Sequence, residues 1–366
     1  MNLKNYPFYI QATVVLFGLI LLVYALSILT DILIPLAFAA FISILLNPLS
    51  QRFERLKIPR PLAILLSMLI AALVLAGLFY FLSSQLSQFG DALPMLKQKL
   101  MVLYGDTKHW VTAKFGVAES KQDQVVKNAI DKSASMVGQT INGVLGILAV
   151  VLLLPVYVFF MLLYKSLLLN FLYEAFAEEN SKKVSEVLAE TKTAVQSYIV
   201  GLLIETLIVA TLNSLALILL GVKYGILIGT IGAILNLIPY LGGIVAIALP
   251  LLIATMTKDG YSTQIGVVVS YLVIQFIDNN ILVPRIVSSK VQINALVSII
   301  VVLLGNQLWG ISGMFLSIPF TAIIKIIFDR IDNLKPWGKL LGDNIPSRHK
   351  GELWHSRFRR KAVSAK

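Results

Sequence analysis

A carboxylate stands within the fifth apolar segment of the chain, at Glu205 in the run 201–208. A charged side chain at the centre of a membrane-spanning helix costs about 2.5–3.5 kcal/mol on insertion scales, so we expect Glu205 to face the interior of a helix bundle. Two interpretations follow: a relay for protons or cations, or a protonated acid hydrogen-bonded to a neighbouring helix. Asn213, further along the same segment, is a second candidate.

A dense polar cluster closes the seventh apolar segment, with Gln275, Asp278, Asn279 and Asn280. Adjacent carboxylate and amide oxygens predict coordination of an ion or a polar ligand. The alternative is a cap that fixes the end of the helix at the membrane interface. Arg285 follows Asp278 by seven residues, so on a continuous helix the two would share a face and pair through an amide or water.

Two further apolar segments are too long to be single upright spans. Residues 225–256 and 295–328 would measure ~48 and ~51 Å as straight helices, against a hydrocarbon core of ~30 Å. Proline and glycine interrupt each one, which predicts either kinks that only shape packing or backbone opened at a transport site, as kinked spans or re-entrant hairpins. The candidate pathway residues at these breaks are Asn236, Pro239, Tyr240, Gly242, Gly243, Asn306 and Gln307.

The elements that must position these residues are membrane helices. Of the 366 residues, 57% are hydrophobic and 14% charged, against about 45–50% and about 25% in soluble domains. The predicted fold class is an all-α integral membrane protein with about eight transmembrane segments, the sixth and eighth broken or re-entrant. The segments cover residues 8–29, 31–49, 61–85, 139–164, 197–220, 225–256, 261–283 and 295–328.

Basic residues predict the orientation and the division of the chain. Four Lys and Arg residues lie in the loop 51–60, and the tail is strongly basic, so both termini are predicted to be cytoplasmic. The predicted regions are segments one to three in 1–85, an extracytosolic amphipathic arm in 86–138, a transport core of segments four to eight in 139–330, and a basic cytoplasmic tail in 331–366. Apolar residues recur in the arm at helical spacing, which favours a structural or oligomer contact, with partner binding as the alternative. The side of the membrane on which the connector 284–294 lies depends on whether the broken segments span the membrane or turn back within it.

Several functional classes are disfavoured. The chain has no phosphate-binding loop, GxSxG or HExxH motif and no cysteine, and its three histidines are isolated, so we predict neither an enzyme nor a cofactor or metal site. The net charge of +12 follows the positive-inside pattern and does not predict nucleic-acid binding. The expected partners are membrane lipid, a small polar substrate, and protons or sodium ions.

Four motifs occur together in this chain: residues 236–243, residues 275–280 followed by Pro284, residues 310–313 and residues 316–319. In order and spacing they resemble the bacterial autoinducer-2 exporter family of permeases, and the resemblance covers residues 8–330. It implies a multi-pass protein of the bacterial inner membrane. Members export the quorum-sensing signal autoinducer-2 or act as sodium or lithium/proton antiporters. It also implies a homo-oligomer, such as a pentamer.

Three hypotheses about function follow. The first is a secondary transporter that exports a small polar molecule, with an ion gradient as the energy source and the Asn236 break and Asp278 cluster beside one mid-membrane cavity. The second is a Na⁺(Li⁺)/H⁺ antiporter with Glu205 as its central carboxylate. The third is a non-transporting oligomeric scaffold or channel, for which we expect no polar cavity.

Overall fold

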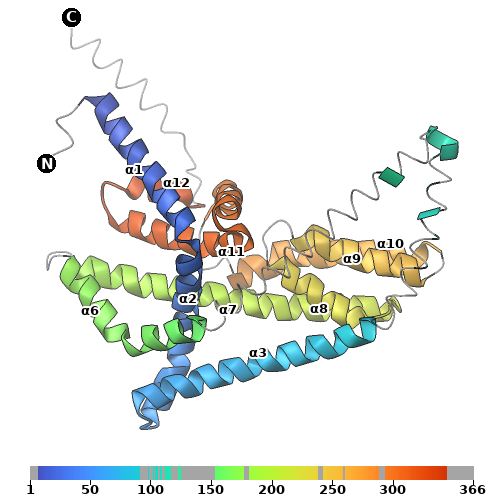
Figure 1. Cartoon of the computed structure of the whole chain (residues 1–366), viewed down its shortest axis with the longest axis horizontal. Helices are drawn as coiled ribbons and strands as arrows, with labels where there is room; N and C mark the ends of the chain where they lie inside the picture. Colours follow the sequence, from blue (N-terminus) through green and yellow to red (C-terminus); the bar gives the residue numbers. More distant parts are fainter. Residues whose placement is uncertain are drawn as a thin grey trace, which may run out of the picture.

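The computed structural model describes residues 7–90, 153–176, 181–237, 242–258, 260–287 and 293–343, with separate positions between 98 and 124. Every regular element among these residues is helical. Helices α3, α7 and α10 extend in a similar direction across Figure 1, and α2 runs steeply to that direction and crosses α7. The helices are α1 (Phe8–Ile28), α2 (Thr30–Arg55), α3 (Arg60–Gly90), Leu153–Leu163, α6 (Lys165–Ala175), α7 (Ser181–Leu219), α8 (Gly225–Asn236), α9 (Gly242–Thr257), α10 (Ser262–Ile277), the π-helix η3 (Asp278–Val287), α11 (Ala295–Arg330) and α12 (Lys335–Leu341).

Six of the described helices are long and apolar enough to cross a membrane, and a bent pair, Leu153–Leu163 with α6, would make seven. Helix α1 buries none of its residues. Lipid tails are as apolar as leucine, so such a helix needs no protein cover in a bilayer. The predicted class, an all-helical multi-pass membrane protein, is confirmed. Most of the predicted arm, the first part of the fourth segment and the end of the tail lie outside the described residues.

The sixth predicted segment is divided into two short helices, α8 and α9, that fold back on each other. A Cβ built on Gly232 of α8 would lie 3.4 Å from the Cβ of Ala246 in α9. At the other end of the pair, Lys258 comes within 3.1 Å of a Cβ built on Gly221, just before α8. The pair therefore begins and ends at the same level, close to the C-terminal end of α7.

Helix α8 packs against α7 through glycine. A Cβ on Gly225 would lie 3.0 Å from the Cβ of Leu217, and one on Gly229 would lie 2.6 Å from the backbone nitrogen of Ser214. Only glycine permits so close an approach of two helices. The four-residue spacing of these glycines in the sequence is typical of such a contact, and the structure uses it as one.

The eighth predicted segment also folds back, within α11. Trp309 and Gly310 leave helical geometry, and the backbones of Gly305 and Gly313 touch across the turn. Asn294, which caps the first turn of α11, binds Leu340 and Gly342 at the end of α12, and a Cβ on Gly342 would lie 3.1 Å from Cε of Lys325. As a straight helix, these 36 residues would hold their ends ~54 Å apart. The contacts with α12 instead show that both ends of α11 lie close together.

An ion-pair network joins the C-terminal end of α11, which we call the base of its fold-back, to the N-terminal end of α7. Arg330 binds Glu186 at 2.8 Å and also binds Glu190. Lys183 of α7 lies 3.8 Å from Asp332, beyond α11. The helical spacing of the two glutamates predicts only a solvated face, and their pairing with a distant arginine is visible only in the structure. The two fold-backs therefore have their bases at opposite ends of α7.

Candidate functional site

The site is organised around Asp278, where α10 changes from α-helix to the π-helix η3. Pro284 lacks a backbone donor and its ring crowds the preceding turn, so the wider π-helical turn relieves the conflict. The side chain of Asp278 is 2% exposed. A carboxyl group is thus placed inside the bundle at a point where the backbone departs from the regular α-helix.

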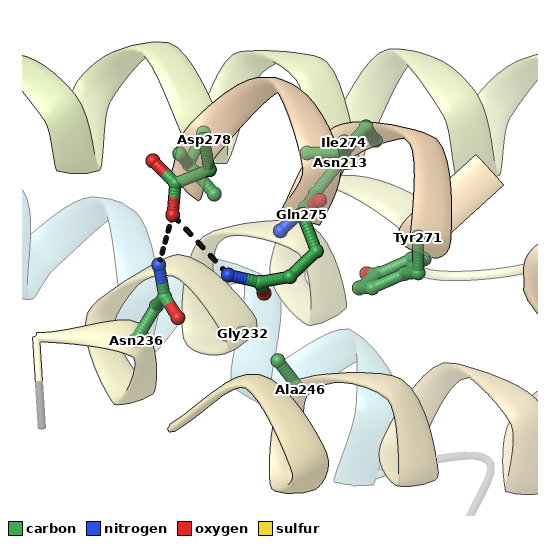
Figure 2. Close-up of a pocket in the computed structure, with 9 residues that line it drawn as sticks. Asn213, Gly232, Asn236, Ala246, Tyr271, Ile274, Gln275 and Asp278 are labelled. Carbon is green, nitrogen blue, oxygen red and sulfur yellow. Dashed lines mark hydrogen bonds between the residues drawn. The ribbon is translucent and has the colours of Figure 1, made fainter. Parts of the chain in front are cut away.

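Two amides hold one oxygen of this carboxyl group. Asn236, the last residue of α8, donates from Nδ2 to Oδ2 of Asp278 over 2.9 Å, and Gln275 donates from Nε2 to the same oxygen over 3.4 Å (Figure 2). Gly243 at the start of α9 comes so near that a Cβ there would lie 2.9 Å from Oε1 of Gln275. The C-terminal end of α8 and the N-terminal end of α9 therefore both meet the end of α10 at this cluster.

A second buried carboxyl group, that of Glu205 in α7, faces Asp278. Glu205 is 6% exposed, and the two carboxyl groups act electrostatically on each other. No lysine, arginine or histidine of the described residues pairs with either group. Two neighbouring carboxylates in a low-dielectric interior repel, so the pair retains at least one proton or holds a cation. The expected burial of Glu205 is confirmed.

A small cavity opens beside the cluster, with room for about one water molecule. Three polar atoms of its lining have no partner in the described part of the chain, namely Oδ1 of Asp278, Oδ1 of Asn213 and the hydroxyl of Tyr271, and neither has Oε2 of Glu205, next to Asp278. Buried polar groups are almost always hydrogen-bonded, so these atoms fit a water, an ion or a solute. The cavity is lined by Val209, Asn213, Gly232, Asn236, Ala246, Tyr271, Ile274, Gln275 and Asp278.

The structure brings some predicted pathway residues together and separates others. Asn213, Asn236, Gln275 and Asp278 line one cavity, and Glu205 and Gly243 adjoin the cluster. The others are placed as follows: Asn279 and Asn280 are exposed, Asn306 and Gln307 are exposed on α11, Gly242 begins α9, and Pro239 and Tyr240 lie outside the described residues.

Asp278 and Arg285 do not share a face, because the helix does not continue as an α-helix through these residues. Arg285 is exposed, and no ion pair joins the two within the described chain. The reason is the π-helix, whose wider turn means that positions seven apart no longer share a face. Sequence reasoning also missed Tyr271, although its position four residues before Gln275 places both on one face of α10.

The family model described as "AI-2E family transporter" matches residues 15–333. The chain is 28% identical over 318 residues to the AI-2 transport protein TqsA of Escherichia coli (strain K12), covering 86% of this chain and 90% of that protein. It is 27% identical over 310 residues to the putative transport protein YrrI of Bacillus subtilis (strain 168), covering 81% and 85%. The chain therefore belongs to the AI-2E family of transporters.

Proposed function

We propose that this protein is a secondary transporter that exports a small polar molecule, driven by an ion gradient through the Glu205–Asp278 pair. The observation that carries the proposal is this pair of buried carboxyl groups, which lies where α8 ends against α10. A buried acid that has no basic partner is costly in a membrane, and such residues mark ion and proton pathways. The polar cavity argues against the scaffold hypothesis.

The arrangement of the two fold-backs supports this function. The 12 residues of α8 extend ~18 Å, which would place Asn236 near the middle of a ~30 Å core. We propose that α8–α9 and α11 are re-entrant hairpins that enter from opposite membrane faces, because their bases lie at opposite ends of α7. Secondary transporters bind their substrates between such broken elements. The connector 284–294 then lies on the cytoplasmic side with the tail.

The substrate follows from family membership alone. One relative is named an AI-2 transport protein, and we take autoinducer-2 as the first molecule to test. A bacterial inner-membrane location, cytoplasmic termini and a homo-oligomer, such as a pentamer, complete the proposal.

A Na⁺(Li⁺)/H⁺ antiporter is the second candidate. The cavity favours it, since room for about one water suits a dehydrated cation or a proton better than a metabolite. The amide oxygen of Asn213, which has no partner in the described part of the chain, would add a neutral oxygen ligand to the carboxyl pair, and hard cations bind oxygen ligands.

The test uses purified protein in liposomes with a pH-sensitive dye inside and labelled autoinducer-2 as a second readout. Glu205→Gln and Asp278→Asn are compared with wild type, and Glu174→Gln, an exposed acid on α6, is the matched control. We expect autoinducer-2 flux that responds to the proton gradient and is lost in both site variants. Proton movement driven by sodium or lithium without signal flux would instead establish the antiporter. Full activity of both site variants would refute the role of the pair.

A further inference from the structure

A cluster of cationic side chains lies away from the carboxyl pair, where α2 ends, α3 begins and the bent pair of helices turns by 64°. Arg60, the first residue of α3, donates to the carbonyl of Leu162 at 2.8 Å and reaches Oγ of Ser166 at 3.5 Å. Lys165, the first residue of α6, donates to Oδ1 of Asn47 at 3.1 Å. These bonds fix two cations at the bend.

The cluster carries excess positive charge. Lys192 of α7 and Arg60 both act electrostatically on Lys165, and the nearby acid is Glu54, 3.9 Å from Arg60. Lys192 is exposed and forms no ion pair with the described residues. The N-terminal end of α6, with its positive partial charge, lies at the same place. Cations held together without matching carboxylates are stabilised by an anion.

The surface beside the cluster is apolar. Within two turns of Lys165, α6 exposes Leu167, Leu168 and Phe171, and Tyr164 just before it is half exposed with its ring stacked on Phe160. A free inorganic anion would bind the cations but would leave this apolar surface uncovered. A molecule with a charged head and long apolar chains would cover both parts.

We propose that Arg60, Lys165 and Lys192 bind the phosphate of an anionic phospholipid at the membrane face that carries the 51–60 loop, with its acyl chains along α6. Guanidinium and ammonium groups between helices near a membrane surface are the usual partners of such headgroups. The lipid would hold α3, α6 and α7 together at this face. This site is independent of the transport pathway.

The test is native mass spectrometry of the full-length protein in detergent, with added phosphatidylglycerol or with phosphatidylcholine of the same acyl chains. We expect wild type to retain phosphatidylglycerol in preference, and Lys165→Gln and Lys192→Gln each to reduce that binding about fivefold. Lys223→Gln, an exposed lysine at the other end of α7, is the matched control and should bind like wild type.

The outcomes separate the possible occupants. Equal binding of phosphatidylglycerol by wild type and both variants would overturn the proposal, as would an equal preference for phosphatidylcholine. Displacement of the lipid by millimolar inorganic phosphate would mean that the site takes a free anion. Should Lys165→Gln fail to fold because Asn47 loses its partner, Lys192→Gln carries the test, since the Lys192 side chain forms no hydrogen bond or ion pair with the described residues.

Discussion

The two fold-backs differ in what surrounds their turns. In α8–α9 the residues that flank the turn meet the Asp278 cluster: Asn236 binds Asp278 of η3, and Gly243 lies against Gln275 of α10. The turn of α11 meets apolar and backbone groups: the indole of Trp309 donates to the carbonyl of Leu26 at 3.0 Å, and its ring lies against Phe320. Similar breaks in the sequence thus give similar backbone paths. The chemistry at each turn depends on which helix lies opposite.

The two fold-backs also differ in how they are held closed. In α11 the backbones of Gly305 and Gly313 touch each other within one element. In α8–α9 the closest approach is to a different helix, from Gly229 to Ser214 of α7. The α11 fold-back should therefore be the more rigid of the two, and α8–α9 the one whose position depends on α7.

Gly313→Ala should give the largest effect on stability. A methyl group there would overlap the backbone of Gly305, so we expect a loss of about 1–3 kcal/mol or more in the free energy of unfolding. Thermal unfolding in detergent is the measurement. Gly77→Ala is the matched control, since nothing lies within 4 Å of that position on α3. An unchanged unfolding temperature for Gly313→Ala would show that the arms of α11 are not in contact.

Gly229→Ala should be less damaging, because α8 can shift away from α7 where the arms of α11 cannot separate. We expect a cost near the lower end of the same range, about 1 kcal/mol, together with reduced transport as Asn236 moves from Asp278. Unfolding temperature and liposome flux measure the two effects. Gly232→Ala faces Ala246 at an ordinary 3.4 Å and should be tolerated. A stable Gly229→Ala variant with normal flux would contradict the coupling of α8 to α7.

Asn236→Ala and Asn306→Ala compare the two turns directly. Asn236 donates to Asp278, whereas Asn306 is exposed on α11, so we expect slower transport only in Asn236→Ala, with an effect of about 1–3 kcal/mol from the lost donor. The measurement is the initial rate of transport into or out of liposomes for each variant. Equal losses in both variants would mean that the α11 turn also lines the pathway, as its sequence predicts.

These contrasts show how much the sequence could predict. Segment length and Pro/Gly breaks predict that residues 225–256 and 295–328 cannot be plain spans, because helix rise and bilayer thickness are fixed. The burial of Glu205 follows equally from the cost of a charge in lipid. The partner of Glu205 cannot be predicted from the sequence, because Asp278 lies 73 positions away and only packing brings the two side chains together. The exposed amides of α11 are predicted from composition alone, and composition carries no information about the facing helix.

The smallest effect is expected at the base of α11, in Arg330→Gln. Its pairs with Glu186 and Glu190 are about one-third to one-half exposed, so their loss should cost about 0.5–1 kcal/mol, and less at high salt. Unfolding temperatures at low and high salt measure this, with Lys339→Gln, an exposed lysine on α12, as the matched control. Because the pairs join α11 to α7 far from the Asp278 cluster, transport should stay near the wild-type rate. A strong transport defect in a stable Arg330→Gln variant would instead mean that α11 moves against α7 during transport and that these pairs set the balance between its positions.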